Sequence, residues 1–225
     1  MSVRPYVLLK CAMSIDGYID DVSEQRLILS SAEDLDRVDE VRASCDAILI
    51  GANTIRRDNP RLLVNSEARR LQRIAQGLPE YPTKVTITAT GLDPDFKFFN
   101  TGGEKLVYCP DVAVDKVRDS LGSHATVVGV RNPVDFGVML DDLGRRGISR
   151  LMVEGGGRIH TQFLTQDLAD EVQLVVAPFF VGEIDAPRFV YPGSFPNDSS
   201  HRMTLADARQ VGDVVLMRFL TRQAQ

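Results

Sequence analysis

Apolar residues along the chain recur with two spacings, which indicates strands and helices in alternation. Short runs rich in Val, Ile and Leu are typical of buried strands, and apolar residues three or four positions apart are typical of helices. The predicted strands are Tyr6–Ala12, Ala47–Ile50, Lys84–Thr88, Lys105–Tyr108, Thr126–Val130, Arg150–Val153, Glu171–Pro178, Met203–Gln210 and Val214–Thr221. The predicted helices are Ser31–Ala43, Glu67–Ala75, Asp115–Leu121, Val134–Arg146 and Arg158–Gln166.

This alternation favours an α/β fold with a mostly parallel sheet, because parallel strands need crossover connections that are usually helical. The last two strands flank Val211-Gly212-Asp213, which indicates a hairpin turn and an antiparallel ribbon. Ser31 is expected to cap the first helix, and Gly147 to end the fourth. No linker or repeat divides the sequence, so we expect one domain over residues 1–225 with a mixed sheet and helices on both faces.

Composition narrows the classes of partner. The chain carries 26 basic and 31 acidic side chains, for a net charge of −5, and no basic block, so a nucleic-acid partner is not expected. The apolar runs are too short to span a membrane, and no basic segment followed by an apolar region opens the chain, which predicts a cytoplasmic protein. The three cysteines and three histidines are scattered, so we expect buried free thiols and no metal site.

The segment LMVEGGGRIHTQFL, Leu151–Leu164, contains the strongest candidate for a binding site. A strand runs up to Glu154, three glycines follow, and a helix begins at Arg158. Glycines let the backbone approach an oxyanion closely, and the N–H groups of the first helical turn then point at it. One glycine suffices for a tight turn, so three favour a phosphate or pyrophosphate site, although the spacing is not that of a Rossmann fingerprint.

A second strand-to-helix junction begins at Gly51. Asn53 and Thr54 follow it and offer capping or ligand hydrogen bonds. Arg56 and Arg57 come one turn later, and two interpretations stay open for them. They bind a ribose 2′-phosphate, which would favour NADPH over NADH, or they are solvated charges on a helix surface.

Two charged residues next to these segments are candidates for chemistry. Lys10 lies inside an otherwise apolar predicted strand, where a lysine is costly unless it lies at an edge or meets an anionic or hydroxyl-rich ligand. Asp58 precedes Asn59-Pro60, where the chain must turn. Its carboxylate either caps that turn or serves a polar substrate as a ligand or proton relay.

Several of these segments resemble the reductase family of riboflavin biosynthesis, which has a dihydrofolate-reductase-like fold. The similarity also extends to VGDVVLMRF near the end of the chain, so it covers nearly the whole sequence. The matching motifs are KCAMSIDGYI at Lys10–Ile19, VRASCDAILIGANTIRRDNPRL at Val41–Leu62, LMVEGGGRIHTQFL at Leu151–Leu164 and DEVQLVVAPFFVG at Asp170–Gly182.

The resemblance implies an NADPH-dependent oxidoreductase that reduces the ribosyl group of a phosphoribosylaminopyrimidine to a ribityl chain. It implies catalytic, substrate-facing roles for Lys10, Asp58 and Glu154. The cofactor-binding residues that it implies are Gly51, Asn53, Thr54, Arg56, Gly155, Gly156, Gly157, Arg158 and Ile159. Ser30, Arg42, Arg61 and Leu62 are implied in substrate binding, and the family is typically homodimeric.

The motifs indicate the cofactor more clearly than they indicate which pyrimidine is the substrate. The segment Leu27–Ala43 resembles the stand-alone archaeal and fungal reductases more than the domain fused to a bacterial deaminase. Asn65 stands where the family usually has a basic residue. The substrate is therefore 5-amino-6-(5-phosphoribosylamino)uracil or its undeaminated 2,5-diamino-pyrimidinone relative. A pterin or folate reductase and a non-catalytic NADPH-binding module are the alternatives.

Overall fold

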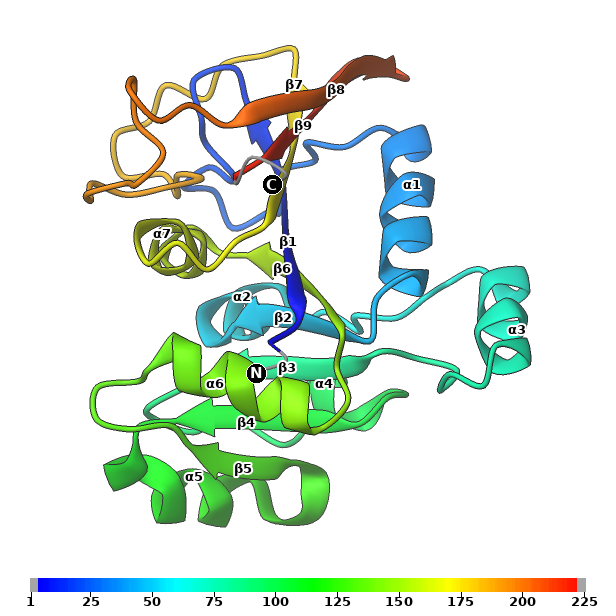
Figure 1. Ribbon diagram of the computed structural model, residues 1–225, viewed down its shortest axis with the longest axis vertical. Coiled ribbons are helices and arrows are strands. Elements are labelled where there is room, and N and C mark those ends of the chain that lie inside the picture. Colours follow the sequence, from blue (N-terminus) through cyan, green and yellow to red (C-terminus); the bar gives the residue numbers. More distant parts are fainter. Residues whose placement is uncertain (1–3, 222–225) are drawn as a thin grey trace. The chain divides into compact units, whose positions relative to one another are not determined.

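The structure, a computed structural model, describes residues 4–221. These residues form two compact units (Figure 1). Unit 1 contains residues 4–6 and 39–152, and unit 2 contains residues 7–38 and 153–221. Each unit is described by itself below, and the single domain over residues 1–225 stays a prediction.

Unit 1 is built on parallel strands. Its strand order is β5-β4-β3-β2, followed by the first half of β6. The strands are almost continuously apolar, as expected of a parallel sheet covered on both faces. Their bounds are β2 (Ala47–Gly51), β3 (Thr83–Ile87), β4 (Lys105–Cys109), β5 (Thr126–Gly129) and β6 (Arg150–Gly155).

The helices of unit 1 lie on both faces of these strands. Connections from β2 through β5 all step in one direction along the sheet, and the connection from β5 to β6 steps back. Right-handed crossovers therefore place the returning helix, α6, on the opposite face, and Figure 1 shows it in front of the strands. The helices are α2 (Ala52–Asp58), α3 (Glu67–Ala75), α4 (Lys97–Asn100), α5 (Val114–Leu121) and α6 (Phe136–Arg145), with short 3₁₀ turns at Asp111–Ala113 and Gly122–His124.

Unit 2 contains the antiparallel part of the fold. Strand β1 (Tyr6–Ser14) pairs in parallel with β7 (Glu171–Ala177), which pairs antiparallel with β9 (Val214–Leu220). Strand β8 (Thr204–Val211) then forms a hairpin with β9, and Gly212 takes a positive φ of 60° in its turn. The predicted C-terminal hairpin and the mixed, mostly parallel sheet are confirmed.

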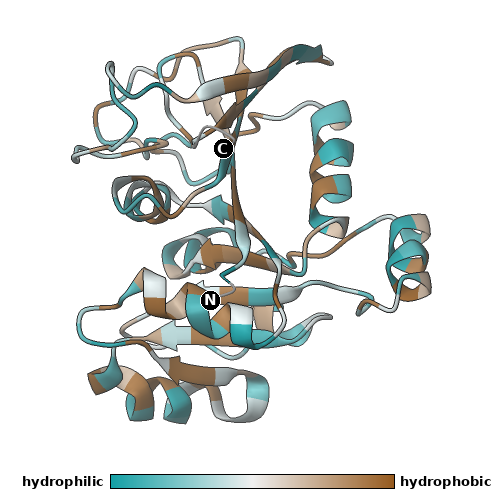
Figure 2. Cartoon of the chain, in the orientation of Figure 1, coloured by the Kyte–Doolittle hydropathy of each residue, from teal (hydrophilic) through white to brown (hydrophobic). Residues whose placement is uncertain are grey.

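Two helices complete unit 2. Helix α1 (Ala32–Ala43) begins in unit 2, and the Ser31 hydroxyl accepts a hydrogen bond from the Asp34 N–H at 3.1 Å, which confirms the predicted cap. Helix α7 (Gly157–Thr165) follows β6. Figure 2 shows α1 mostly hydrophilic and strands β2 and β5 hydrophobic. A small core of apolar residues from β7, β9 and the segment before α1 is formed by Leu29, Val175, Ala177, Val214 and Leu216.

Most predicted elements agree with the structure to within two residues at each end, and Gly147, with φ of 85°, follows α6 as expected. Helix α4 was not predicted, because a single turn has no helical periodicity. The three cysteines are buried and free, which confirms that expectation. Within residues 4–221, no helix is both long enough and apolar enough to cross a membrane.

Candidate active site

The glycine turn between β6 and α7 lies in unit 2. Strand β6 extends to Gly155, two residues beyond the predicted end, and Gly155 takes a φ of 117° that only glycine adopts readily. The Gly155–Gly156 peptide bond is cis. Gly156 is the extended N-cap residue, and α7 begins at Gly157. The predicted strand–glycine–helix junction is therefore present, with helical N–H groups directed toward its N-terminus.

Two of the three glycines have reasons inside the protein itself. A Cβ on Gly157 would lie 2.0 Å from the Arg188 carbonyl oxygen, so the loop that carries Arg188 needs that space. A Cβ on Gly155 would lie 3.1 Å from a ring carbon of His160, in addition to the strain of its positive φ. The number of glycines is therefore not by itself evidence of a phosphate. The feature that still favours a phosphate site is the N-terminus of a nine-residue helix that follows a glycine N-cap.

Lys10 occupies an interior strand of unit 2. Strand β1 lies between the second half of β6 and β7, so Lys10 is not at an edge, and its side chain is only 10% exposed. Its Nζ lies 3.6 Å from Oδ2 of Asp34, whose side chain is fully buried. Burial lowers the pKa of Lys10 below its ordinary value, whereas the carboxylates of Asp34 and Glu154 act in the opposite direction. Of the two alternatives for Lys10, the edge is therefore excluded.

These contacts bring together three of the predicted residues. Lys10, Glu154 and Ser30 all belong to unit 2. Lys10 interacts with both Asp34 and Glu154, and Ser30 interacts with Asp34. The Ser30 hydroxyl and the Lys10 ammonium help to hold the pKa of Asp34 below its usual value although burial opposes them. Arg158 is exposed at the first turn of α7, and Ile159 beside it is half-buried.

His160 was not predicted as part of the site. Its ring is fully buried under the glycine turn, and neither ring nitrogen has a hydrogen bond of normal geometry within residues 4–221. Burial lowers the pKa of His160 to about 4, and weak backbone hydrogen bonds to Phe189 and Val153 only partly oppose this shift. The imidazole is therefore neutral at physiological pH. His160 lies four residues after Gly156, and this helical spacing is the feature of the sequence that could have placed it beneath the turn.

The junction between β2 and α2 belongs to unit 1. Of the two roles expected for Asn53 and Thr54, capping is excluded, because Gly51 is the N-cap and both residues lie inside the first turn. The Asn53 amide oxygen instead accepts a hydrogen bond from Arg56 Nη1 at 3.0 Å. A glycine N-cap costs little, because the backbone there is extended and the N–H groups stay accessible to solvent or a ligand.

Arg56 lines a cavity of about 370 Å³ in unit 1. Its Nη2 donates to the Thr90 hydroxyl at 2.9 Å and to the Gly91 carbonyl at 2.8 Å, so its guanidinium is fixed in one direction. Arg56 is nevertheless exposed, as a charge on a helix surface would be, and these hydrogen bonds hold it in place there. The other lining residues are Leu92, Asp93, Phe96 and Ser120.

The loop after α2 is held by a few main-chain contacts. Asn59 takes a left-handed conformation with φ of 41°, and its side-chain oxygen accepts the N–H of Lys97 at 2.7 Å. The Arg61 carbonyl accepts the Thr101 hydroxyl at 3.1 Å. Leu62 is buried with φ of 51°, so its side chain packs inside unit 1 and is not open to a substrate. Asp58 is the last residue of α2.

Arg42 and Asp39, both on α1, hold the segment that follows. Arg42 Nη1 donates to the Leu63 carbonyl at 3.2 Å. The Asp39 carboxylate accepts the backbone N–H groups of Asn65 and Ser66, and it also pairs with Arg69 at 3.0 Å. Asn65 is thus held just before helix α3, whose first turn carries Arg69. The Asp39 contacts were not predicted, because nothing local links residues this far apart.

The chain matches the family model described as the RibD C-terminal domain over residues 5–217. It belongs to the RibD C-terminal domain family. A relative from Archaeoglobus fulgidus is 36% identical over 187 residues, which cover 82% of this chain and 85% of the relative. That protein is named 2,5-diamino-6-ribosylamino-4(3H)-pyrimidinone 5′-phosphate reductase, as is a relative from Aquifex aeolicus that is 33% identical over 83% of each chain.

Solved structures agree with this assignment at the level of the fold. A pyrimidine reductase-like protein from Corynebacterium diphtheriae has a TM-score of 0.78 at 19% identity, covering 99% of this chain and 94% of its own. RibD from Acinetobacter baumannii has a TM-score of 0.78 at 22% identity over 98% of this chain. The chain spans 59% of the length of that RibD structure. The predicted dihydrofolate-reductase-like fold is thus confirmed.

Proposed function

We propose that this member of the RibD C-terminal domain family is an NADPH-dependent reductase of 2,5-diamino-6-ribosylamino-4(3H)-pyrimidinone 5′-phosphate. The observation that carries the proposal is the buried Lys10 ammonium beside the carboxylates of Asp34 and Glu154. Buried charged groups are costly, and they are concentrated at functional sites. The proposal also draws on the relatives at 33–36% identity that bear this enzyme's name.

The undeaminated pyrimidine is favoured over the deaminated one by the pattern of similarity. The relatives named as diaminopyrimidinone reductases match over 83–85% of their own length. Those named RibD from Chlamydia pneumoniae and Chlamydia trachomatis are 27–28% identical and match over 48–55% of theirs. An enzyme built like the first group would accept the pyrimidine before deamination.

One feature of unit 2 supports the binding of a nicotinamide dinucleotide. The glycine N-cap Gly156 carries no side chain, and α7 behind it is long enough for its N-terminal N–H groups to favour an anion. We assign Gly155, Gly156, Gly157, Arg158 and Ile159 to the pyrophosphate. The bound cofactor would supply the hydride that reduces the anomeric carbon of the sugar.

In unit 1, we assign Gly51, Asn53, Thr54 and Arg56 to cofactor binding. The cavity lined by Arg56 and Thr90 offers a guanidinium and a hydroxyl group, which are suitable donors to a ribose 2′-phosphate. This donor set supports NADPH rather than NADH. An aromatic side chain, Phe96, and Leu92 line the same cavity and suit an apolar portion of the ligand.

The chain's own residues would orient the sugar and manage one proton. Lys10 offers N–H donors for the sugar hydroxyls, and its charge is already balanced by two carboxylates, so it suits a hydroxyl better than a phosphate. Glu154 would accept a hydrogen bond from the substrate or hold the proton that completes the reduction. In unit 2, we assign Ser30 to substrate binding. In unit 1, we assign Asp58, Arg42, Arg61 and the main chain at Leu62 to substrate binding.

A steady-state assay of NADPH oxidation tests the function. The purified chain is mixed with the diaminopyrimidinone or with its deaminated counterpart, and NADH replaces NADPH in parallel reactions. The proposal expects turnover with the diaminopyrimidinone at a higher kcat/KM than with the deaminated compound. Tight NADPH binding without oxidation in the presence of either compound would instead leave a non-catalytic binding module.

We further propose a homodimer that pairs through strand β8. This strand is last in the sheet order and exposes Leu205, while Val215 on the neighbouring β9 is also exposed. Open strand edges with apolar side chains favour pairing with another copy. Light scattering should give twice the chain mass, and Leu205→Lys should shift the equilibrium toward the monomer.

A further inference from the structure

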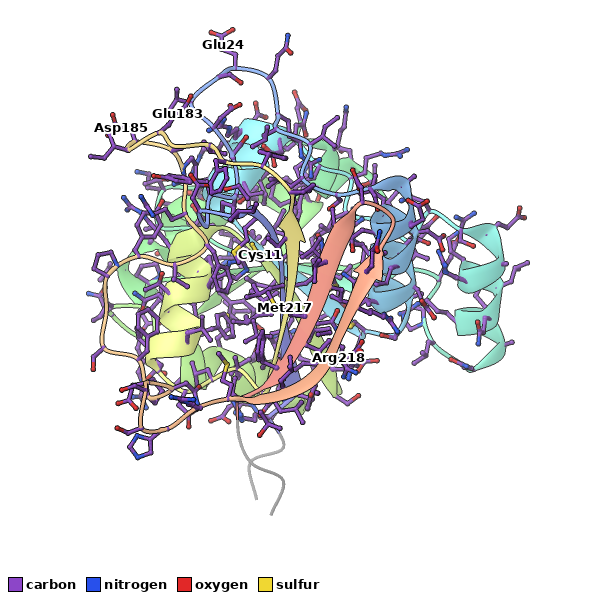
Figure 3. All side chains as sticks on the ribbon, turned by 90° about the horizontal axis from the view of Figure 1, so that it is seen from above. Cys11, Glu24, Glu183, Asp185, Met217 and Arg218 are labelled. Atoms are coloured by element: carbon purple, nitrogen blue, oxygen red, sulfur yellow. The ribbon has the colours of Figure 1, made fainter. Side chains whose placement is uncertain are left out.

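A row of polar side chains crosses three neighbouring strands of unit 2. Lys10 on β1 pairs in register with Gln173 on β7, and Gln173 pairs in register with Arg218 on β9. Residues directly opposite one another on neighbouring strands point to the same face of a sheet. Figure 3 labels Arg218 and Met217 on β9, and Cys11, which follows Lys10, on β1. The row is unusual because the flanking positions of β1 and β7 are apolar.

Hydrogen bonds join this row to helix α1. Arg37 Nη1 donates to the Gln173 amide oxygen at 2.7 Å, and the Gln173 amide nitrogen donates to Glu171 Oε1 at 2.8 Å. Arg218 Nε donates to the same Glu171 oxygen at 2.7 Å. A continuous chain of side chains therefore runs from the partly exposed Arg218 inward to Arg37. Each polar group in it has a partner, as buried polar networks require.

Asp34 connects this chain to Lys10. Its Oδ1 accepts two hydrogen bonds from Arg37, at 3.0 Å from Nε and 2.8 Å from Nη2, which hold this oxygen in place. Its Oδ2 then faces Lys10 Nζ at 3.6 Å. Because the carboxylate is fully buried and Arg37 holds its Oδ1, Oδ2 is the oxygen left to attract the Lys10 ammonium.

Asp34 also contacts the second residue that we assigned to the substrate. Burial raises the pKa of the Asp34 carboxyl, and the Ser30 hydroxyl is among the groups that lower it, while the Ser31 hydroxyl caps the N–H of Asp34. Asp34 thus stands in the first turn of α1, where the helix dipole favours an acidic side chain. One carboxylate therefore interacts with both Lys10 and Ser30.

We propose that Asp34 is a positioning residue: it holds the Lys10 ammonium protonated and aimed, and Arg37, Gln173, Glu171 and Arg218 hold Asp34 in place. The kinetic part of this inference rests on the proposed function, because it assumes that Lys10 touches the substrate. The electrostatic part does not. It concerns only the coupling between Asp34 and Lys10.

The charged and titratable groups that face Lys10 determine the sign of each test. Asp34 on α1, Glu154 on β6 and the neighbouring thiol of Cys11 favour its charged form, whereas Arg37 on α1 disfavours it. The buried His160 on α7 also senses the Lys10 charge. Removing the Asp34 charge should therefore lower the pKa of Lys10. Removing the Arg37 charge should raise it.

Lysine NMR tests the electrostatic part without any substrate. The chain has five lysines, so ¹³Cε-labelled lysine gives few signals, and Lys10→Met identifies the signal of Lys10. We expect Asp34→Asn to lower the pKa of Lys10 by about one unit or more, as loss of a near counter-charge does. Lys84, buried in unit 1, should keep its own pKa and serves as the internal control. An unchanged Lys10 pKa would overturn the proposal.

The pH profile of kcat/KM tests the kinetic part. As the pH rises, kcat/KM of Asp34→Asn should begin to fall at a lower pH than kcat/KM of the wild type. At basic pH, kcat/KM should then be about tenfold below the wild-type value for each unit by which the Lys10 pKa is lowered. NADPH affinity should change by less than about twofold, because the N-terminus of α7 is untouched. A shifted Lys10 pKa with an unmoved kinetic profile would overturn the positioning role. Wild-type protein without turnover would refute the proposed function alone.

A second variant keeps the test decisive if Asp34→Asn does not fold. Arg37→Gln retains a hydrogen-bonding side chain beside Gln173 but removes the cation that competes for Asp34. We expect the pKa of Lys10 to rise and the basic limb of the profile to move to higher pH. Arg218→Gln, at the far end of the row, should give a smaller change of the same sign. A fall, or no change, in the Lys10 pKa of Arg37→Gln would contradict the proposal.

Discussion

Two lysines are buried in this protein, one in each unit, and their surroundings are opposite in kind. Lys10 in unit 2 faces two carboxylates, and its Nζ lies 3.6 Å from Asp34. Lys84 in unit 1 donates to the carbonyls of Phe98 and Thr101, at 3.1 and 3.2 Å, and to the Thr101 hydroxyl at 2.6 Å. Neutral oxygens satisfy its hydrogen bonds but do not balance its charge.

The difference separates a functional lysine from a structural one. Burial lowers the pKa of Lys84 to about 7, with the Lys105 charge adding to the effect. Lys84 ties β3 to the end of α4, and its role needs donors more than charge. Lys10 keeps counter-charges that a merely structural lysine would not need. Buried ion pairs are weak devices for stability, so their presence favours a role in chemistry.

Replacing each lysine by methionine gives the largest expected contrast. Lys10→Met should lower kcat/KM by about 10²–10⁴-fold, the range for loss of a catalytic donor. Lys84→Met should retain most activity and instead lower the free energy of unfolding by about 1–3 kcal/mol, because buried oxygens lose their donors. Steady-state kinetics and urea unfolding of both variants measure this. Equal losses of activity in the two variants would erase the distinction.

Glu154→Gln sharpens the comparison on the carboxylate side of Lys10. We expect turnover to fall by about 10²-fold, because the amide cannot hold a proton or balance the ammonium. NADPH affinity should stay nearly unchanged, as measured by fluorescence titration. Unchanged turnover would confine the turn from Glu154 to Gly157 to cofactor binding.

Arg56→Ala tests the fixed cation of unit 1. Loss of a guanidinium that contacts a 2′-phosphate should weaken NADPH binding by about tenfold, or about 1.4 kcal/mol. NADH binding should not change, because NADH lacks that phosphate. Arg57→Ala, the neighbouring arginine on α2, is the matched control. A parallel loss of affinity for both cofactors would place Arg56 elsewhere in the site.

Lys84 should also make the stability of the protein depend on pH. Its pKa in the folded chain is about 7, below the ordinary value of 10.5, so the unfolded chain binds more protons between those values. The stability of the wild type relative to Lys84→Met should therefore rise with pH from about 7 to 10.5. Midway between the two pKa values, the slope should approach the ~1.4 kcal/mol per pH unit that one full proton gives. Urea unfolding at several pH values would show a flat difference if Lys84 were unperturbed.

Most of the fold was predictable from the sequence, because buried parallel strands are apolar runs and their helices have a clear period. The bounds of β2, β4 and α3, for example, follow directly from such patterns. Helix α4 was not predictable, since one turn of helix depends on the tertiary contacts of Lys84.

The residues of the site were more predictable from the sequence than the contacts that hold them in place. Lys10 was identified by its cost in an apolar strand, but its partner Asp34 lies on another element and resembled an ordinary acidic residue of a first helical turn. The polar Glu171 and Gln173 inside an otherwise apolar strand were the local sign of the network. The three glycines were over-interpreted, because the contacts of Gly157 with the Arg188 loop are invisible in a linear sequence.

Transfer of deuterium from labelled cofactor tests the central claim most directly. The chain is incubated with NADPH carrying deuterium at the nicotinamide C4 position and with 2,5-diamino-6-ribosylamino-4(3H)-pyrimidinone 5′-phosphate, and the product is analysed by mass spectrometry and NMR. The account predicts one deuterium on the first carbon of a new ribityl chain, with its formation greatly slowed in Lys10→Met. Recovery of unreduced ribosyl compound from the wild-type reaction, with no deuterium in it, would contradict the account.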